Sequence, residues 1–144
     1  MTDLIDWLRL APWYAAASVL LLENVHPVAI ALMKAEGFQV ETHTAALTEE
    51  ELIERIRNVS ILGIRSKTMV TARVLENANR LMAIGAFCIG TNQIDLQAAT
   101  KRGIAVFNAP FSNTRSVVEL AISQMIMLIR NIPDKSARMH QGIW

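Results

Sequence analysis

Residues 59–87 read VSILGIRSKTMVTARVLENANRLMAIGAF. Two apolar stretches, 59–64 and 81–87, flank a polar turn and a segment of helical periodicity that Thr71 can cap at its N-terminus. Strands that are apolar throughout are typical of parallel sheets, because the crossover helices of such sheets bury them on both faces. This stretch therefore predicts two parallel strands joined by a helix.

The same alternation of strand and helix extends along the chain in both directions. Thr48 and Glu51 have the spacing of a capping box, and Asp95 can cap a helix that follows the fourth strand. The expected strands are 18–22, 38–40, 59–64, 81–87 and 104–107, and the expected helices are 28–35, 49–56, 72–78 and 96–101. Residues 17–112 are thus predicted to form one α/β domain, a flavodoxin-like doubly wound parallel sheet, with residues 1–16 as a leading arm.

The C-terminal region follows a different pattern. Residues 114–132 have the spacing of a single long helix that is apolar on nearly every side. Such a helix must be covered, and no later part of this sequence is suited to cover it, so we expect self-association through 114–132. Pro133 is expected to break the helix and 136–140 to begin another, which leaves 113–144 as a separate region that looks truncated.

The composition excludes several classes of function. The formal net charge is only +1 and the Lys and Arg residues are scattered, so the basic face of a nucleic-acid-binding protein is missing. The single cysteine, Cys88, excludes an intrachain disulfide and favours a reducing cytosol. The apolar run at 10–22 is too short to span a bilayer. We therefore expect a cytoplasmic protein with neither nucleic-acid nor membrane partners.

Three loops that follow predicted strands carry residues suited to a binding site, because ligands of open parallel sheets bind at the carboxyl ends of the strands. The loop RSKT at 65–68 offers two cations and two hydroxyls that can hold a carboxylate or a phosphate. The loop at 89–93 contains Gly90, where a ligand can approach the backbone closely. The third loop runs over 108–115, where the residues SNTR at 112–115 open the long helix. Each loop also has a purely structural interpretation, respectively as a solvated loop, a plain turn and a helix cap.

Other polar residues favour structural roles. His26, His43 and His140 have no close acidic or cysteine companion, so we expect no metal site. The acidic run at 49–51 falls in a first helical turn, where carboxylates interact favourably with the helix dipole. Cys88 is expected to be a small buried apolar side chain. No glycines form the pattern G-x-G-x-x-G, so the sequence carries no dinucleotide-binding fingerprint.

Five segments of the sequence carry a resemblance to a known family. They are LLLENVHPVAI from Leu20, GIRSKT from Gly63, AIGAFCIGTNQIDLQAATKRGI from Ala83, VFNAPFSNTRSVVEL from Val106, and HQGIW at the end. At these segments the sequence closely resembles the D-3-phosphoglycerate dehydrogenases, which belong to the D-isomer-specific 2-hydroxyacid dehydrogenase family. The resemblance spans most of 17–144 and does not cover the arm at 1–16.

The resemblance implies an NAD-dependent oxidoreductase that converts 3-phosphoglycerate to 3-phosphohydroxypyruvate in serine biosynthesis, as a cytosolic homo-oligomer. It implies that 17–112 is the substrate-binding domain and that 113–144 is the crossover and dimerisation helix with the start of the nucleotide-binding domain. The family's catalytic Arg, Glu and His and its glycine-rich NAD loop would lie beyond Trp144. The chain is therefore expected to contain no catalytic residue, to lack the nucleotide-binding Rossmann domain and to be inactive alone.

The resemblance also assigns binding residues. Arg65 and Ser66 match the pair that holds the anionic groups of the substrate, whereas Thr44 stands where close relatives can carry a substrate-binding lysine. The residues expected to bind substrate are Arg65, Ser66, Lys67 and Asn113, and those expected near the nicotinamide are Ile89 and Gly90.

Two alternatives stay open at this point. The chain could be a non-catalytic module that binds a small anion or associates with itself. It could also be a fragment of a dehydrogenase for another 2-hydroxy acid, such as glycerate, because the chemistry of the loops does not count phosphate groups.

Overall fold

The computed structural model describes residues 17–144, so the predicted leading arm at 1–16 lies outside the described residues. The chain divides into two compact units, one that ends at Pro110 and one that comprises Phe111–Trp144.

The first unit is built on a parallel sheet. Within residues 17–110, its five strands are β1 (Ser18–Leu21), β2 (Gln39–Thr42), β3 (Ile61–Ile64), β4 (Ala83–Ala86) and β5 (Ala105–Asn108), in the spatial order β2-β1-β3-β4-β5. The helices described in the same range are α3 (Pro27–Ala35), α4 (Glu49–Ile56), α5 (Ala72–Asn77) and α6 (Leu96–Lys101). All neighbouring strands pair in parallel. The predicted flavodoxin-like α/β fold is confirmed, because this is the strand order of that fold.

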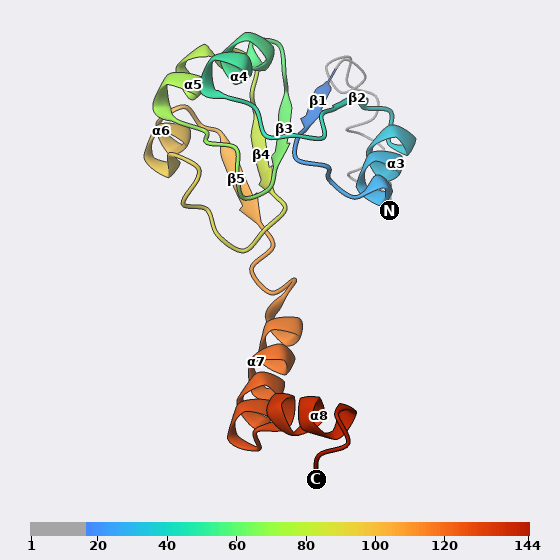
Figure 1. The fold of residues 1–144 in the computed structure, drawn as a ribbon. Coiled ribbons are helices and arrows are strands. Elements are labelled where there is room, and N and C mark those ends of the chain that lie inside the picture. The colour runs from blue at the N-terminus through green and yellow to red at the C-terminus, as the bar shows by residue number, and fades with distance from the viewer. Residues whose placement is uncertain (1–16) are drawn as a thin grey trace, which may run out of the picture. The chain divides into compact units, whose positions relative to one another are not determined.

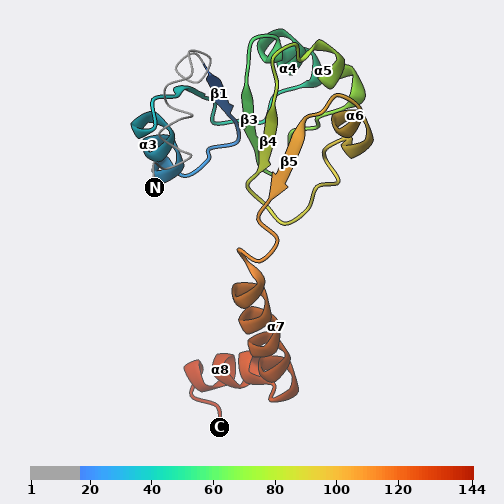
Figure 2. The same ribbon diagram turned by 180° about the vertical axis from the view of Figure 1, so that it is seen from behind.

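Helices cover both faces of the sheet, but unequally. Helices α4, α5 and α6 lie on one face and α3 lies on the other, as Figures 1 and 2 show from opposite sides. Side chains of a strand alternate between faces, so Leu20 joins the large core under α4 to α6, whereas Val19 and Leu21 join a smaller core with α3. The central strands β1, β3 and β4 are therefore largely apolar, because both of their faces are packed.

The helix starts follow the signals in the sequence. The predicted capping box is present, since Thr48 N–H donates to Glu51 Oε2 at 2.8 Å and Glu51 N–H donates to Thr48 Oγ1 at 3.4 Å. Thr71 and Asp95 cap α5 and α6 as predicted, accepting hydrogen bonds from backbone N–H groups three residues later. Helix α6 ends at Lys101, and Gly103, just after the C-cap residue Arg102, adopts a left-handed conformation with φ +69°. These local signals set where the helices begin, and therefore where the loops that precede them end.

The second strand differs from the prediction. We expected it at 38–40, but β2 runs over Gln39–Thr42. Phe38 N–H instead bonds to the Met33 carbonyl and completes the C-terminus of α3, beyond Gly37. Since β2 lies at the edge of the sheet, its residues Gln39, Glu41 and Thr42 are polar and exposed. The apolar pattern that marks a buried strand therefore does not extend over this strand.

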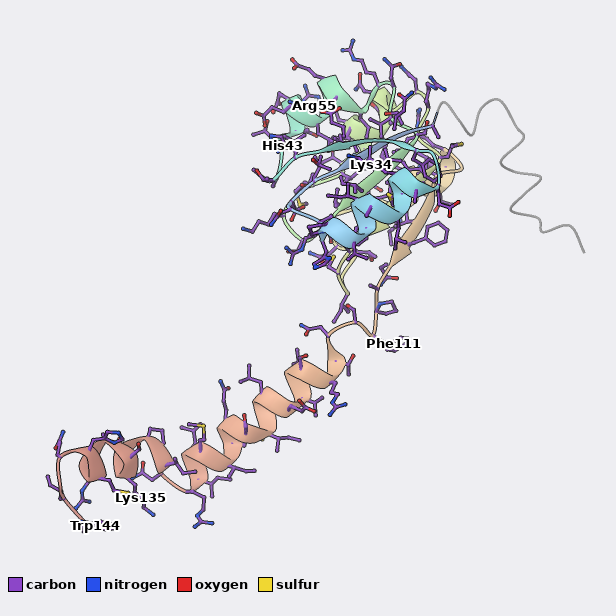
Figure 3. The ribbon with its side chains drawn as sticks, turned by 90° about the vertical axis from the view of Figure 1, so that its right-hand side faces the viewer. Lys34, His43, Arg55, Phe111, Lys135 and Trp144 are labelled. Atoms are coloured by element: carbon purple, nitrogen blue, oxygen red, sulfur yellow. The ribbon has the colours of Figure 1, made fainter. Side chains whose placement is uncertain are left out.

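The second unit contains α7 (Thr114–Ile129) and α8 (Ile132–His140). The predicted helix over 114–132 is three residues too long, because Asn131 adopts a left-handed conformation with φ 50° and separates the two helices. The second helix begins at Ile132 and not at 136, since Pro133 is tolerated in a first helical turn. Neither helix contains a buried residue; Figure 3 shows side chains projecting all around this unit, from Phe111 to Trp144.

No helix among the described residues is long and apolar enough to cross a membrane.

Candidate functional site

The loops that follow β1, β2 and β3 meet at one hollow. Since the strands are parallel and adjacent, their carboxyl ends lie at the same edge of the sheet, and β1 and β3 flank the point where the strand order reverses. The hollow has a volume of about 610 Å³ and is lined by Glu23, Asn24, Thr44, Ala45, Ala46, Arg65, Ser66 and Lys67. The structure therefore brings together three of the four predicted substrate-binding residues, Arg65, Ser66 and Lys67.

Arg65 is the cation at the centre of this edge. It lines the hollow and also a second one of about 380 Å³, which extends past the start of α3 to Phe87. Its guanidinium makes no hydrogen bond or ion pair within the described part of the chain, unlike Arg73, which pairs with Glu49 and Glu50. An exposed and unpaired guanidinium is free to bind a carboxylate or phosphate in bidentate fashion.

Ser66 and Lys67 complete the loop. Both are exposed, and neither of their side chains has a hydrogen-bond partner among residues 17–144. A hydroxyl and an ammonium beside the Arg65 guanidinium supply donors to an anion that enters the hollow. The loop after β2 also lines the hollow, through Thr44, Ala45 and Ala46. Thr44 is the residue that, by the family resemblance, stands where close relatives can carry a lysine.

Glu23 is the residue of this site that sequence reasoning missed. It follows β1 and is 7% exposed. Its Oε1 accepts hydrogen bonds from the backbone N–H groups of Arg65 at 3.2 Å and Thr68 at 2.9 Å, and its Oε2 accepts one from Lys67 N–H at 2.9 Å. The carboxylate thus fastens the end of β1 to the loop after β3.

The charge on Glu23 is stabilised by these donors. Burial acts to raise the pKa of the Glu23 carboxyl, but the hydrogen bonds from Thr68, Lys67 and Arg65 outweigh that effect and lower the pKa below its ordinary value. The Thr68 hydroxyl also lies near and favours the charged form, although its fully buried Oγ1 makes no hydrogen bond of normal geometry within the described residues. The site therefore contains a carboxylate that is ionised at neutral pH.

One signal for Glu23 was present in the sequence. It is a single acidic residue directly after a fully apolar strand, LLLE at 20–23, at the edge where ligands of such sheets bind. Glu23 and Asn24 both adopt positive φ angles, 61° and 54°, which are uncommon for residues other than glycine. The turn after β1 is therefore held in an unusual conformation that turns the carboxylate toward the Arg65 loop.

The predicted loop at 89–93 lies beside the Arg65 loop and is held by Gln93. The Gln93 side chain is 3% exposed, and its Nε2 donates to the Arg65 carbonyl at 2.9 Å and the Gly90 carbonyl at 3.2 Å. Ile89 is exposed, and its carbonyl accepts a hydrogen bond from Asn108 Nδ2 at 2.7 Å. Gly90 and Ile89 thus use their carbonyls to fix the loop, which leaves the Ile89 side chain projecting into solvent.

Cys88 differs from the expectation of a buried apolar side chain. It is half-buried, and its Sγ lies 3.2 Å from Gln93 Nε2 and within hydrogen-bond reach of the carbonyls of Arg65 and Gly90. Cys88 does pack against the large core, as an apolar side chain would, but it also has polar partners in its own loop, at Gly90 and Gln93, and in the Arg65 loop.

Asn113, the fourth predicted substrate-binding residue, belongs to the second unit. It is the N-cap residue of α7, but its side chain makes no capping hydrogen bond. Arg115 in the first turn pairs with Glu119 at 2.6 Å. The segment at 112–115 therefore opens the helix without the side-chain cap of Asn113 that we considered.

The remaining candidates have local partners. His26 caps α3 by accepting a hydrogen bond from Val28 N–H at 3.2 Å, and the acidic run at 49–51 lies in the first turn of α4, where Glu51 closes the capping box. Among residues 17–144 no group of three or more His, Cys, Asp or Glu side chains is arranged to hold a metal ion.

The turn from β1 to α3 differs from the turn of a dinucleotide-binding site. Pyrophosphate groups bind at helix N-termini that present free N–H groups, usually after a glycine-rich turn. Here α3 begins at Pro27, which has no N–H, the N–H of Val28 is taken by His26, and the Glu23 carboxylate occupies the turn. NAD phosphates therefore do not fit at the turn from β1 to α3.

Comparison with known proteins agrees with the fold. The family model of the D-isomer specific 2-hydroxyacid dehydrogenase catalytic domain matches residues 19–137. D-3-phosphoglycerate dehydrogenase 1 of Saccharomyces cerevisiae is 56% identical over 126 residues, which cover 88% of this chain and 27% of that protein. The chain thus spans about a quarter of the length of this relative.

Solved structures share the fold. The TT0316 protein from Thermus thermophilus aligns with a TM-score of 0.76 at 25% identity, over 88% of this chain and 41% of that one. The NAD⁺-bound 3-phosphoglycerate dehydrogenase of Entamoeba histolytica aligns with a TM-score of 0.65 at 21% identity, over 78% of this chain and 39% of that one. Because the family model covers most of the sequence, this chain belongs to the D-isomer specific 2-hydroxyacid dehydrogenases.

Proposed function

We propose that this chain is the N-terminal part of an NAD-dependent dehydrogenase that oxidises 3-phosphoglycerate to 3-phosphohydroxypyruvate in serine biosynthesis, and that it holds the anionic groups of the substrate. The observation that carries the proposal is the exposed, unpaired Arg65 guanidinium in a hollow at the carboxyl ends of β1 and β3. The name of the similar yeast protein supports this choice of substrate over other 2-hydroxy acids.

The chemistry of the hollow suits a small molecule with two anionic groups. Arg65 and Lys67 present two cations, and Ser66 adds a hydroxyl donor between them. Among the described residues that line the hollow, Glu23 carries the one carboxylate. Backbone N–H groups compensate its charge, so it opposes an entering anion less than a free carboxylate would. We assign Asn113 as a further substrate contact and Ile89 and Gly90 as neighbours of the nicotinamide, in line with the family resemblance.

We expect binding without turnover from the isolated chain. NAD supplies the hydride acceptor of the family reaction, but this sequence has no G-x-G-x-x-G loop to hold it and no acid or base that we assign to catalysis. Purified chain mixed with NAD and 3-phosphoglycerate should produce no NADH, measured by absorbance. A substantial rate would contradict this part of the proposal.

Binding is tested by calorimetric titration with 3-phosphoglycerate. Arg65→Gln should weaken the affinity roughly tenfold to a hundredfold, because it removes charge-assisted hydrogen bonds. Arg80→Gln is the matched control: Arg80 is also exposed, but precedes β4 at the opposite edge of the sheet. Its affinity should stay within about twofold of the unsubstituted chain at physiological salt. Equal losses in both variants would overturn the role of Arg65.

Self-association through 114–132 is a second candidate function. Helix α7 exposes apolar side chains on all sides, among them Leu120, Ile126 and Leu128, which favours a partner of the same kind. Sedimentation velocity should show a dimer that Leu128→Glu dissociates and that Gln124→Glu preserves, since Gln124 is already polar. A monomer at every concentration would contradict it.

We place the protein in the cytosol, because Cys88 is its only cysteine.

A further inference from the structure

We propose that Glu23 and Gln93 are positioning residues of the anion site, and that they fix the Arg65 peptide from both of its ends. This inference rests on the proposed function of the hollow, and it names two residues that neither the sequence motifs nor the family resemblance assigned. Neither side chain needs to touch the substrate for this role.

The two ends of Arg65 have separate anchors. Its N–H donates to Glu23 Oε1 at 3.2 Å, and its carbonyl accepts a hydrogen bond from Gln93 Nε2 at 2.9 Å. Both anchoring side chains are buried, with exposed fractions of 7% for Glu23 and 3% for Gln93. Buried side chains are restrained by packing, so the direction in which the Arg65 side chain leaves the backbone is restrained as well.

Glu23 also decides which donors of the loop face the hollow. Backbone N–H groups that converge on one point form a nest that binds anions. Here the N–H groups of Arg65, Lys67 and Thr68 converge on the Glu23 carboxylate, so the chain fills its own nest. Within the described residues the Ser66 N–H has no such partner. A substrate anion is therefore directed to Ser66 and to the side chains of Arg65 and Lys67.

The sign of one substitution separates positioning from simple electrostatics. Glu23 lines the hollow, so if its negative charge only repelled the substrate, Glu23→Gln would tighten anion binding. If Glu23 positions the loop, the same substitution weakens binding. The side-chain NH₂ group of glutamine then faces a backbone N–H, from which it cannot accept a hydrogen bond. Oε1 of a glutamine can still serve Arg65 and Thr68, so the contact with Lys67 N–H is the one lost.

The test combines calorimetry with amide hydrogen exchange followed by NMR on the whole chain, using 3-phosphoglycerate as the probe. Glu23→Gln and Gln93→Met should each weaken binding roughly tenfold, because the first removes the contact with Lys67 N–H and the second removes the hydrogen bonds to the Arg65 and Gly90 carbonyls. The matched controls Glu54→Gln and Gln97→Met alter exposed side chains of α4 and α6 and should stay within about twofold. Binding by folded Glu23→Gln that equals or exceeds that of the unsubstituted chain would overturn the proposal.

Hydrogen exchange keeps the test independent of substrate binding. In the unsubstituted chain the backbone amides of Arg65, Lys67 and Thr68 should exchange slowly and that of Ser66 quickly. Glu23→Gln should increase the exchange rate of the Lys67 amide the most. If the chain binds no 3-phosphoglycerate but shows this exchange pattern, the proposed function fails and the anchoring stands. If all four amides exchange alike in the unsubstituted chain, the anchoring is wrong, even where Glu23→Gln does not fold.

Discussion

Glu23 and Arg65 are separated by 42 positions in the sequence, yet the Glu23 carboxylate accepts a hydrogen bond from the Arg65 backbone N–H at 3.2 Å. The contact joins the loops after β1 and β3, the two strands between which the order of the sheet reverses. The local order of the proposed substrate site thus depends on a buried charge, and this has measurable consequences.

Stability should depend on pH through Glu23. Its pKa in the folded chain is lowered from the ordinary value of 4.5, so the folded state binds the proton less readily than the unfolded state. The resulting stabilisation is fully present above the unfolded-state pKa and is lost as pH falls through the folded-state pKa. Urea unfolding between about pH 3 and about pH 7 should show a flatter pH dependence for Glu23→Gln than for the unsubstituted chain. Parallel curves would contradict the assignment.

Thr48→Ala should destabilise the first unit by about 1 kcal/mol, because it removes the N-terminal cap of α4 and one half of the capping box. Thr100→Ala is the control: Thr100 lies inside α6, where its hydroxyl bonds to the Leu96 carbonyl, and alanine is a better helix former. Chemical denaturation should therefore show a loss for the first variant and little change for the second. Equal stabilities would show that the capping box contributes nothing.

Gly63→Ala should cost about 1–3 kcal/mol, the usual range for overpacking a core. A Cβ at this position of β3 would contact Leu21 Cδ2 and lie 3.0 Å from Phe87 Cε2, and Leu21 is fully buried against α3. Gly85→Ala on β4 is the matched control, since its Cβ would meet Phe87 Cε2 at an ordinary 3.6 Å. In thermal unfolding, Gly63→Ala should have the lower midpoint temperature of the two variants. A lower midpoint temperature for Gly85→Ala would contradict this packing.

The sequence predicts the sheet well because its signals are local. Thr71 and Asp95 are residue types that favour a helix N-cap, and they mark the starts of α5 and α6. The central strands are largely apolar because both of their faces are covered. The edge strand β2 was misplaced because polar residues such as Gln39 and Glu41 carry no such signal. Asn131 gave no sign that it would separate α7 from α8.

The candidate site was predictable only in part. The loop of Arg65 and Lys67 could be found because it follows an apolar strand at the edge where ligands bind. Glu23 and Gln93 could not be joined to it, since their contacts with Arg65 span 42 and 28 positions and depend on the strand order. Residues that act through tertiary contacts leave little trace in local sequence patterns.

Binding of an anion in the hollow at the ends of β1 to β3 is the function from which the roles of Arg65, Glu23 and Gln93 follow. Its most direct test is a titration of isotope-labelled chain with 3-phosphoglycerate, followed through backbone amide shifts in NMR. We predict the largest shifts at Ser66 and Lys67 and in the facing loop at 44–46. Shifts confined to other parts of the chain, for example between α5 and α6, would contradict the account.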